Sequence, residues 1–172
     1  MTIFQLGKLQ AGDQFKPLII SDIGINHGGD INAAISIAEK AINAGAKIIK
    51  HQTHIPDDEM SIEAKNIKPG NSDRSIYEVI SSCALNEKDE YSLMRFVESK
   101  GALFLSTPFS RAAVERLNKF GVAGFKVGSG ECNNYPLLKL IAKQKKPVIL
   151  STGMNNIESI KKAVNILSPN CQ

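Results

Sequence analysis

The chain alternates between short apolar runs and amphipathic stretches, and this alternation limits its fold more than any other feature. Five runs have the length and composition of strands that are buried on both faces: residues 18–25, 46–50, 102–106, 122–127 and 147–151. Stretches with helical spacing separate or follow them: residues 30–45, 87–100, 110–120, 136–143 and 156–167. Strands that alternate with helices are typical of a parallel sheet covered by helices, so the sequence predicts the α/β class.

Residues with capping preferences mark where these helices begin and end. Asp30, Asn86 and Ser110 stand where a side chain can accept hydrogen bonds from the first backbone N–H groups of a helix. Gly45 and Gly101 stand where a left-handed residue ends a helix. The caps therefore support the helix assignments independently of the apolar spacing.

Polar residues stand at the carboxyl end of every predicted strand. They are Asp22, Asn26, Lys50, Gln52, Thr107, Lys126, Ser129, Ser151 and Thr152. In an open doubly wound sheet only the strands beside the switch point need such residues, whereas all strands of a (β/α)8 barrel end at one mouth. We therefore expect a TIM-type (β/α)8 barrel. A complete barrel takes about 250 residues, so the 172 residues here predict one truncated to about its first five βα units, with residues 1–172 as its N-terminal portion.

The connection between the second and third strands is unusually long. Residues 53–84 contain no long periodic helix, although connections of this kind are usually a few residues. We expect this segment to arch over the mouth of the barrel as a functional loop, with a short helix near residues 75–82.

Composition excludes several classes of protein. No apolar run reaches the roughly 20 residues of a membrane helix, and no secretory signal is recognisable at the N-terminus. The three cysteines lack CxxC spacing, which argues against a disulfide framework or a zinc ribbon. The net charge of +4 comes with no aromatic residues among the lysine clusters. We expect a cytoplasmic protein with no nucleic-acid partner and no membrane contact.

Two lysines at strand ends indicate an anionic ligand. Lys50 and Lys126 should both point into the mouth, where two ammonium groups favour an anion that offsets their repulsion. Hydroxyl groups and glycine-exposed amides nearby suit phosphate oxygens. The residues alone leave a second interpretation open, in which one lysine forms a structural ion pair with Asp22 or Glu131.

The three histidines do not form a recognisable metal motif. They are His27, His51 and His54, and no two of them stand at helical i, i+4 spacing. Because a strand alternates its faces, His51 should point away from Lys50 and Gln52. We therefore expect no metal ligand within this chain. A hydrolase is also disfavoured, since no Gly-x-Ser-x-Gly elbow is present.

Several stretches in order along the chain resemble the bacterial sialic acid (N-acetylneuraminate) synthases. They are 23–27 (IGINH), 50–54 (KHQTH), 58–61 (DEMS), 69–71 (PGN), 75–78 (SIYE), 106–110 (STPFS), 126–136 (KVGSGECNNYP) and 150–154 (LSTGM). The resemblance implies a (β/α)8 barrel followed by a small antifreeze-like domain in a homodimer. It also implies condensation of phosphoenolpyruvate with N-acetylmannosamine to give N-acetylneuraminate and phosphate. The KHQTH stretch is more similar to N-acetylneuraminate synthases than to their legionaminate or pseudaminate relatives.

The resemblance assigns roles to residues of this chain. Phosphoenolpyruvate would be held by Lys50, Thr107, Lys126, Ser129 and Ser151. The amino sugar would meet Gln52, Asn71 and Glu131. The residues expected to take part in catalysis are Asp22, Lys50, Lys126 and Glu131.

The chain departs from the family pattern in two ways. Asp22 stands where the family usually has a catalytic glutamate, and a shift near 1 Å in an active site can cost about 10²-fold in rate. The later strands, which in the family carry two histidine ligands of manganese or magnesium, are absent, as is the antifreeze-like domain, so we expect the metal ligands to lie outside this chain.

These departures keep other functions open. The chain could be a non-catalytic half-barrel that binds an anion or assembles with other chains, or part of a legionaminate or pseudaminate synthase. A doubly wound nucleotide-binding protein is disfavoured, because the first predicted strand is not followed by G-x-G-x-x-G.

Overall fold

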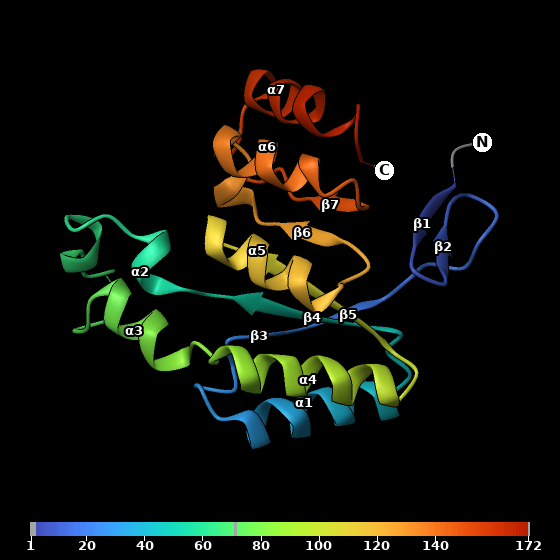
Figure 1. Ribbon diagram of the computed structural model, residues 1–172, viewed down its shortest axis with the longest axis horizontal. Coiled ribbons are helices and arrows are strands. Elements are labelled where there is room, and N and C mark those ends of the chain that lie inside the picture. The colour runs from blue at the N-terminus through green and yellow to red at the C-terminus, as the bar shows by residue number, and fades with distance from the viewer. Residues whose placement is uncertain (1–2, 71, 172) are drawn as a thin grey trace.

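The computed structural model describes residues 3–70 and 72–171, and its strands form two sheets (Figure 1). The strands of the antiparallel pair are β1 (Phe4–Leu6) and β2 (Leu9–Ala11). The strands of the parallel sheet are β3 (Ile20–Gly24), β4 (Ile48–Thr53), β5 (Leu103–Pro108), β6 (Phe125–Val127) and β7 (Val148–Leu150). The α/β class is therefore confirmed.

The parallel sheet is singly wound, in the order β3-β4-β5-β6-β7. The main helices are α1 (Ile31–Asn43), α4 (Glu87–Ser99), α5 (Arg111–Phe120), α6 (Tyr135–Lys143) and α7 (Ile157–Leu167). Because the strand order never reverses and crossovers between parallel strands are right-handed, these helices all cover one face of the sheet. This arrangement is that of a barrel wall and not of a doubly wound sheet.

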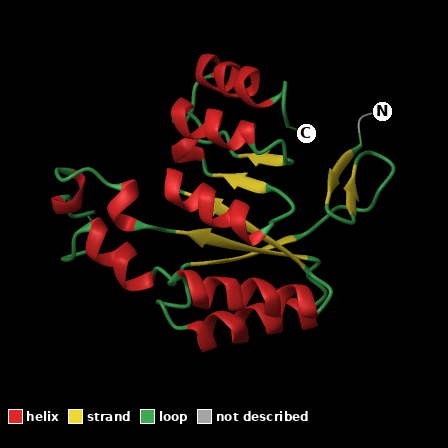
Figure 2. Cartoon of the chain, viewed as in Figure 1, coloured by secondary structure: helices red, strands yellow, loops and turns green. Residues whose placement is uncertain are grey.

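The two faces of the sheet have separate apolar cores. Residues of the outer face, such as Ile49, Phe104 and Phe125, pack with the helices in the larger core. On the inner face, Ile48 and Leu105 pack against Leu6 of the β1–β2 hairpin in a smaller core. The hairpin thus covers the amino-terminal end of the inner face, and the strand arrows point away from it in Figure 2. The carboxyl ends of the strands are left for polar residues.

Helix caps predicted from the sequence are present. The side chains of Asp30, Asn86 and Ser110 accept hydrogen bonds from the first N–H groups of α1, α4 and α5. Each such cap stabilises its helix by about 1 kcal/mol. Gly121 ends α5 in the left-handed conformation, with φ of 79°.

Some strand boundaries differ from the sequence prediction. The second strand begins at Ile48 and continues to Thr53, so Gln52 belongs to the strand and not to a loop. The predicted strand at 122–127 is regular only over Phe125–Val127. Just before the regular part of this strand, a Cβ atom on Gly124 would come within 2.7 Å of the Pro147 carbonyl oxygen and 2.5 Å of Leu6 Cδ1. The chain enters β6 through a close backbone approach that only glycine allows.

The long connection between β4 and α4 contains three short helices. They are α2 (Pro56–Glu59), η1 (Ala64–Asn66) and α3 (Ile76–Cys83). The short helix expected near residues 75–82 is confirmed, and Ser75 and Glu78 form a reciprocal capping box at its start. Figure 1 shows α2 and α3 beyond the carboxyl end of β4, beside the predicted mouth.

No helix within residues 3–70 and 72–171 is both long and apolar enough to cross a membrane.

Candidate functional site

Side chains from neighbouring strands meet at the carboxyl end of the inner face. Asp22 of β3 lies opposite Lys50 of β4 in the strand register, and Gln52 of β4 lies opposite Thr107 of β5. Lys126 of β6 pairs with Ile149, two residues before Ser151. Successive strands therefore bring the predicted residues to one edge, which we call the mouth; it is defined by Asp22, Lys50, Gln52, Thr107, Lys126, Ser129 and Ser151.

Lys50 forms an ion pair across the first two strands. Its ammonium group donates to Asp22 Oδ2 at 2.9 Å, and the side chains are 12% and 54% exposed. Of the two ion pairs left open by the sequence, the one with Asp22 is present. A half-exposed carboxylate holds Lys50 only weakly, so the pair orients the ammonium group without strongly neutralising it.

Lys126 is held by neutral groups. Its ammonium group donates to the Val127 carbonyl at 2.6 Å and to the Ser151 hydroxyl, and within residues 3–70 and 72–171 it has no carboxylate within ion-pair distance. Burial lowers the pKa of Lys126, the nearby Lys50 lowers it further, and Asp22 opposes the shift. The two lysines are thus close enough to repel each other, and a bound anion would relieve that repulsion.

Thr107 adds a hydroxyl group that has no hydrogen-bond partner among residues 3–70 and 72–171. The residue is 2% exposed, and its Oγ1 makes no hydrogen bond to any described atom. Buried hydroxyl groups are normally satisfied, so this donor is available to a ligand that enters the mouth.

Ser129 lies beside the loop that follows β7. It opens the short helix η2 (Ser129–Glu131), and its carbonyl accepts a hydrogen bond from Asn155 Nδ2 at 2.7 Å. Its Oγ lies 3.9 Å from the point where a Cβ on Gly153 would be. These contacts place Ser129 beside the loop that follows Ser151, at that end of the mouth.

Two predicted sugar-binding residues stay predictions. Glu131 accepts a hydrogen bond from Asn134 Nδ2 at 2.7 Å, a contact within its own turn. Asn71 lies outside the described residues.

A buried polar cluster, which the sequence did not predict, lies behind the mouth on the outer face. Glu90 of α4 is 1% exposed, bonds Thr53, and lies 3.1 Å from Arg116 Nη1 and 3.2 Å from His51 Nδ1. Burial alone would raise the pKa of Glu90, but His51, Thr53 and Arg116 outweigh it and lower that pKa. His51 therefore points away from Lys50, as its position in the strand predicted.

The cluster continues to His27. The ring nitrogens Nε2 of His27 and His51 are 3.3 Å apart, and Nδ1 of His27 accepts from the Gly29 N–H at 3.1 Å. The one sequence signal for the burial of Glu90 is its spacing from Leu93, Met94 and Val97, the buried face of α4.

The metal implied by the resemblance has no ligand set in the described part of the chain. Residues 3–70 and 72–171 contain no group of three or more histidine, cysteine, aspartate or glutamate side chains that could hold an ion. The residues present therefore do not form the site of that metal, and the expectation of manganese or magnesium stays a prediction about residues outside this chain.

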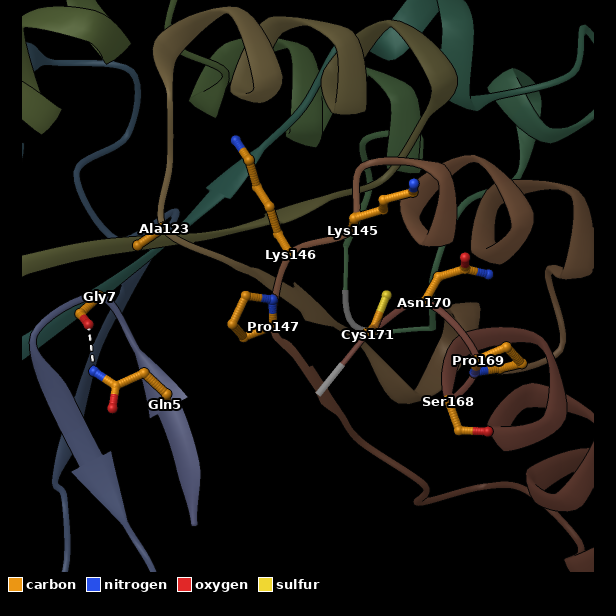
Figure 3. A pocket seen from close by; sticks show the side chains of 10 residues that line it. All are labelled: Gln5, Gly7, Ala123, Lys145, Lys146, Pro147, Ser168, Pro169, Asn170 and Cys171. Carbon is orange, nitrogen blue, oxygen red and sulfur yellow. Dashed lines mark hydrogen bonds between the residues drawn. The ribbon is translucent and has the colours of Figure 1, made fainter.

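A hollow of about 490 Å³ lies at the opposite end of the strands (Figure 3). Its lining includes Ala123 and Pro147, which precede β6 and β7, together with Lys145 and Lys146. Active sites of (β/α)8 barrels lie at the carboxyl ends of the strands, so we place the functional site at the mouth. Lys146 is useful as a control, because it is also a lysine whose pKa burial lowers.

Comparison with known proteins identifies the relatives of this chain. Residues 37–172 match the model of the NeuB family. The chain is 38% identical over 159 residues to an N,N'-diacetyllegionaminic acid synthase of Campylobacter jejuni, a match that covers 90% of the chain and 48% of the relative. It is 32% identical to the human N-acetylneuraminate-9-phosphate synthase, over 92% of the chain and 45% of the relative.

The fold is similar to that of a solved relative. The crystal structure of a sialic acid synthetase from Leptospira borgpetersenii, in complex with citrate, matches with a TM-score of 0.87 and 27% identity over 98% of this chain and 56% of that one. The chain spans about half the length of the curated relatives that it matches.

Proposed function

Because the chain belongs to the NeuB family, we propose that its mouth binds phosphoenolpyruvate for condensation with an acyl-amino sugar. The observation that carries the proposal is the meeting of Lys50, Lys126 and the unpartnered Thr107 hydroxyl at one strand edge. Phosphoenolpyruvate has a phosphate and a carboxylate group, which match two separate ammonium groups. The Leptospira relative was solved with citrate, itself a carboxylate anion.

The lysines neutralise charge and fix the position of the reactant. In the proposed reaction, C3 of phosphoenolpyruvate forms a bond to the aldehyde carbon of the open-chain sugar, and C2 becomes electron-poor. Water adds at C2, and phosphate leaves with cleavage of its bond to that carbon. Lys126, Lys50 and the hydroxyl groups of Thr107, Ser129 and Ser151 hold the phosphate and carboxylate oxygens throughout, which stabilises the charge on the leaving phosphate.

Asp22 has a different role in the proposal. Its half-exposed carboxylate lies beside Lys50 at the edge of the mouth, where it stabilises the cationic centre at C2 or accepts a proton from the attacking water. A divalent metal, manganese or magnesium, would supply Lewis-acid polarisation of the aldehyde when bound. None of the roles given to residues of this chain depends on it.

The sugar is proposed to meet Gln52, Glu131 and Asn71. N-acetylmannosamine is the first candidate, through the resemblance of the KHQTH stretch. The acyl-amino sugar that leads to legionaminic acid is the second, because the identity to the Campylobacter synthase (38%) exceeds that to the human N-acetylneuraminate-9-phosphate synthase (32%). We further propose a homodimer in the cytoplasm, as the resemblance implies.

The proposal is tested with the complete protein that contains this chain. It is incubated with manganese, phosphoenolpyruvate and each candidate sugar in turn, while phosphate release and the mass of the product are followed. We expect a nine-carbon acidic sugar from one acceptor, loss of turnover in Lys126→Met, and retention of turnover in Lys146→Met. Phosphoenolpyruvate binding without product from any acceptor would favour the non-catalytic anion-binding alternative.

A further inference from the structure

Gln52 is held from behind by a histidine that the anion site does not use. Nε2 of His54 lies 3.0 Å from Gln52 Oε1. His54 is 6% exposed and stacks on Phe109, with ring centroids 4.3 Å apart and planes 13° apart. The imidazole ring therefore has one fixed orientation, with one nitrogen toward Gln52.

The other nitrogen of His54 faces a buried carboxylate. Nδ1 lies 3.1 and 3.0 Å from the two oxygens of Glu59, whose side chain is 6% exposed. Asp58, the neighbouring carboxylate of α2, instead accepts from the Ala112 N–H at 2.8 Å and from Arg111 at 3.2 Å. Asp58 thus fastens α2 to the start of α5, which keeps Glu59 in place against His54.

These contacts determine the protonation of His54. A carboxylate accepts hydrogen bonds only, so Nδ1 must carry a proton toward Glu59. The Gln52 oxygen is also an acceptor, so Nε2 must carry a second proton. The alternative is a Gln52 amide rotated by 180°, with its NH₂ group toward a neutral His54.

The opposite side of Gln52 is lined by polar groups. Asp22 Oδ1, Gln52 Nε2 and Asn26 Nδ2 lie 3.5, 3.7 and 3.8 Å from the point where a Cβ on Gly24 would be. The structure thus places the Gln52 oxygen toward His54 and the Gln52 NH₂ group on the side of Asp22, whose carboxylate is an acceptor.

We propose that His54, held by Glu59, is a positioning residue that fixes the Gln52 amide with its NH₂ group toward the mouth. The amide then donates to an acceptor oxygen of the sugar. The relay of Glu59, His54 and Gln52 therefore selects a sugar that presents a carbonyl or hydroxyl oxygen at that point. The selection rests on the proposed function, whereas the orientation of Gln52 rests on the contacts alone.

A double-mutant cycle in the complete protein tests the relay. His54→Ala should raise KM for the sugar about tenfold, the effect of one lost hydrogen bond, with KM for phosphoenolpyruvate and kcat within about twofold. Glu59→Gln, nearly isosteric, should raise the same KM, and Asp57→Asn on the same helix should not, since Asp57 contacts Lys65 and Tyr77. In a Gln52→Ala background, His54→Ala should have no further effect; independent, multiplicative effects would overturn the relay.

A readout that needs no turnover separates the relay from the proposed function. In ¹⁵N spectra of the three histidines near neutral pH, both ring nitrogens of His54 should be protonated, and Glu59→Gln should leave Nε2 without a proton. If both nitrogens are protonated but the complete protein has no condensation activity, the proposed function is refuted while the orientation of Gln52 remains supported. A bare Nε2 in the unaltered protein would overturn the relay even if the synthase activity is confirmed.

Discussion

The buried His27 predicts that the stability of the protein falls in mildly acidic solution. His27 is 3% exposed, and burial, followed by the neighbouring His51, lowers its pKa from 6.5 to about 4. Between those values the unfolded chain binds a proton that the folded chain does not, so the free energy of unfolding decreases as the pH falls. The full slope is 1.36 kcal/mol for each pH unit, and the unfolded imidazole is half protonated at pH 6.5, so the loss between pH 6.5 and 4.5 is about 2 kcal/mol.

Urea unfolding at a series of pH values measures this loss. The range from pH 4.5 to 7.5 keeps Glu90 ionised, because its pKa is lowered. The comparison is His27→Asn, whose side-chain oxygen can still accept from the Gly29 N–H but does not titrate. The smaller side chain lowers the free energy of unfolding by the same amount at every pH, so the test compares only how this free energy changes with pH in the two proteins. Equal pH dependence in the two proteins would refute the reasoning about His27.

Two further substitutions have defined outcomes. Asp22→Glu should raise the turnover of the complete protein, because the carboxylate would extend one methylene further into the mouth; an equal or lower rate in a steady-state assay would mean that the site is adapted to aspartate. Glu90→Gln should lower the free energy of unfolding by about 3 kcal/mol, because it leaves Arg116 without its buried carboxylate; a change below about 1 kcal/mol in urea unfolding would contradict the role given to the cluster.

The sequence predicted the wall of the barrel because its signals are local. Strands buried on both faces must be apolar runs, and the caps at Asp30, Asn86 and Ser110 depend only on residues within one turn. The meeting of Lys50 and Lys126 was also predictable, since parallel strands carry their carboxyl ends to one edge. Once the strands were recognised, the parallel topology was enough to predict that these two lysines lie at the same edge of the sheet.

The remaining features depend on contacts between distant segments. The β1–β2 hairpin has strands of three residues, and it is fixed by the packing of Leu6 against Ile48 and Leu105. Glu90 resembles an exposed acidic residue of a first helical turn until Arg116 and His51 are placed beside it. No periodicity in residues 53–84 indicated that Glu59 of this connection would lie against His54, at the end of β4.

The choice of partner for Lys50 also could not be read from the sequence. Asp22 and Glu131 were both candidates, and the register of β3 with β4 places Asp22 directly opposite Lys50. Glu131 instead bonds Asn134 within its own turn. Strand register is fixed by packing over the whole sheet, so it is not visible in the residues near either carboxylate.

Calorimetric titration of phosphoenolpyruvate into the complete protein tests the central claim most directly. Two lysine variants are compared with the unaltered protein: Lys126→Met at the mouth and Lys146→Met at the opposite end of the strands, the latter in the lining shown in Figure 3. Loss of a charge-assisted contact of about 1.5–3 kcal/mol corresponds to a rise in Kd of about ten- to 150-fold. The account predicts that rise for Lys126→Met and an unchanged Kd for Lys146→Met. Unchanged binding in Lys126→Met, or equal weakening in both variants, would contradict it.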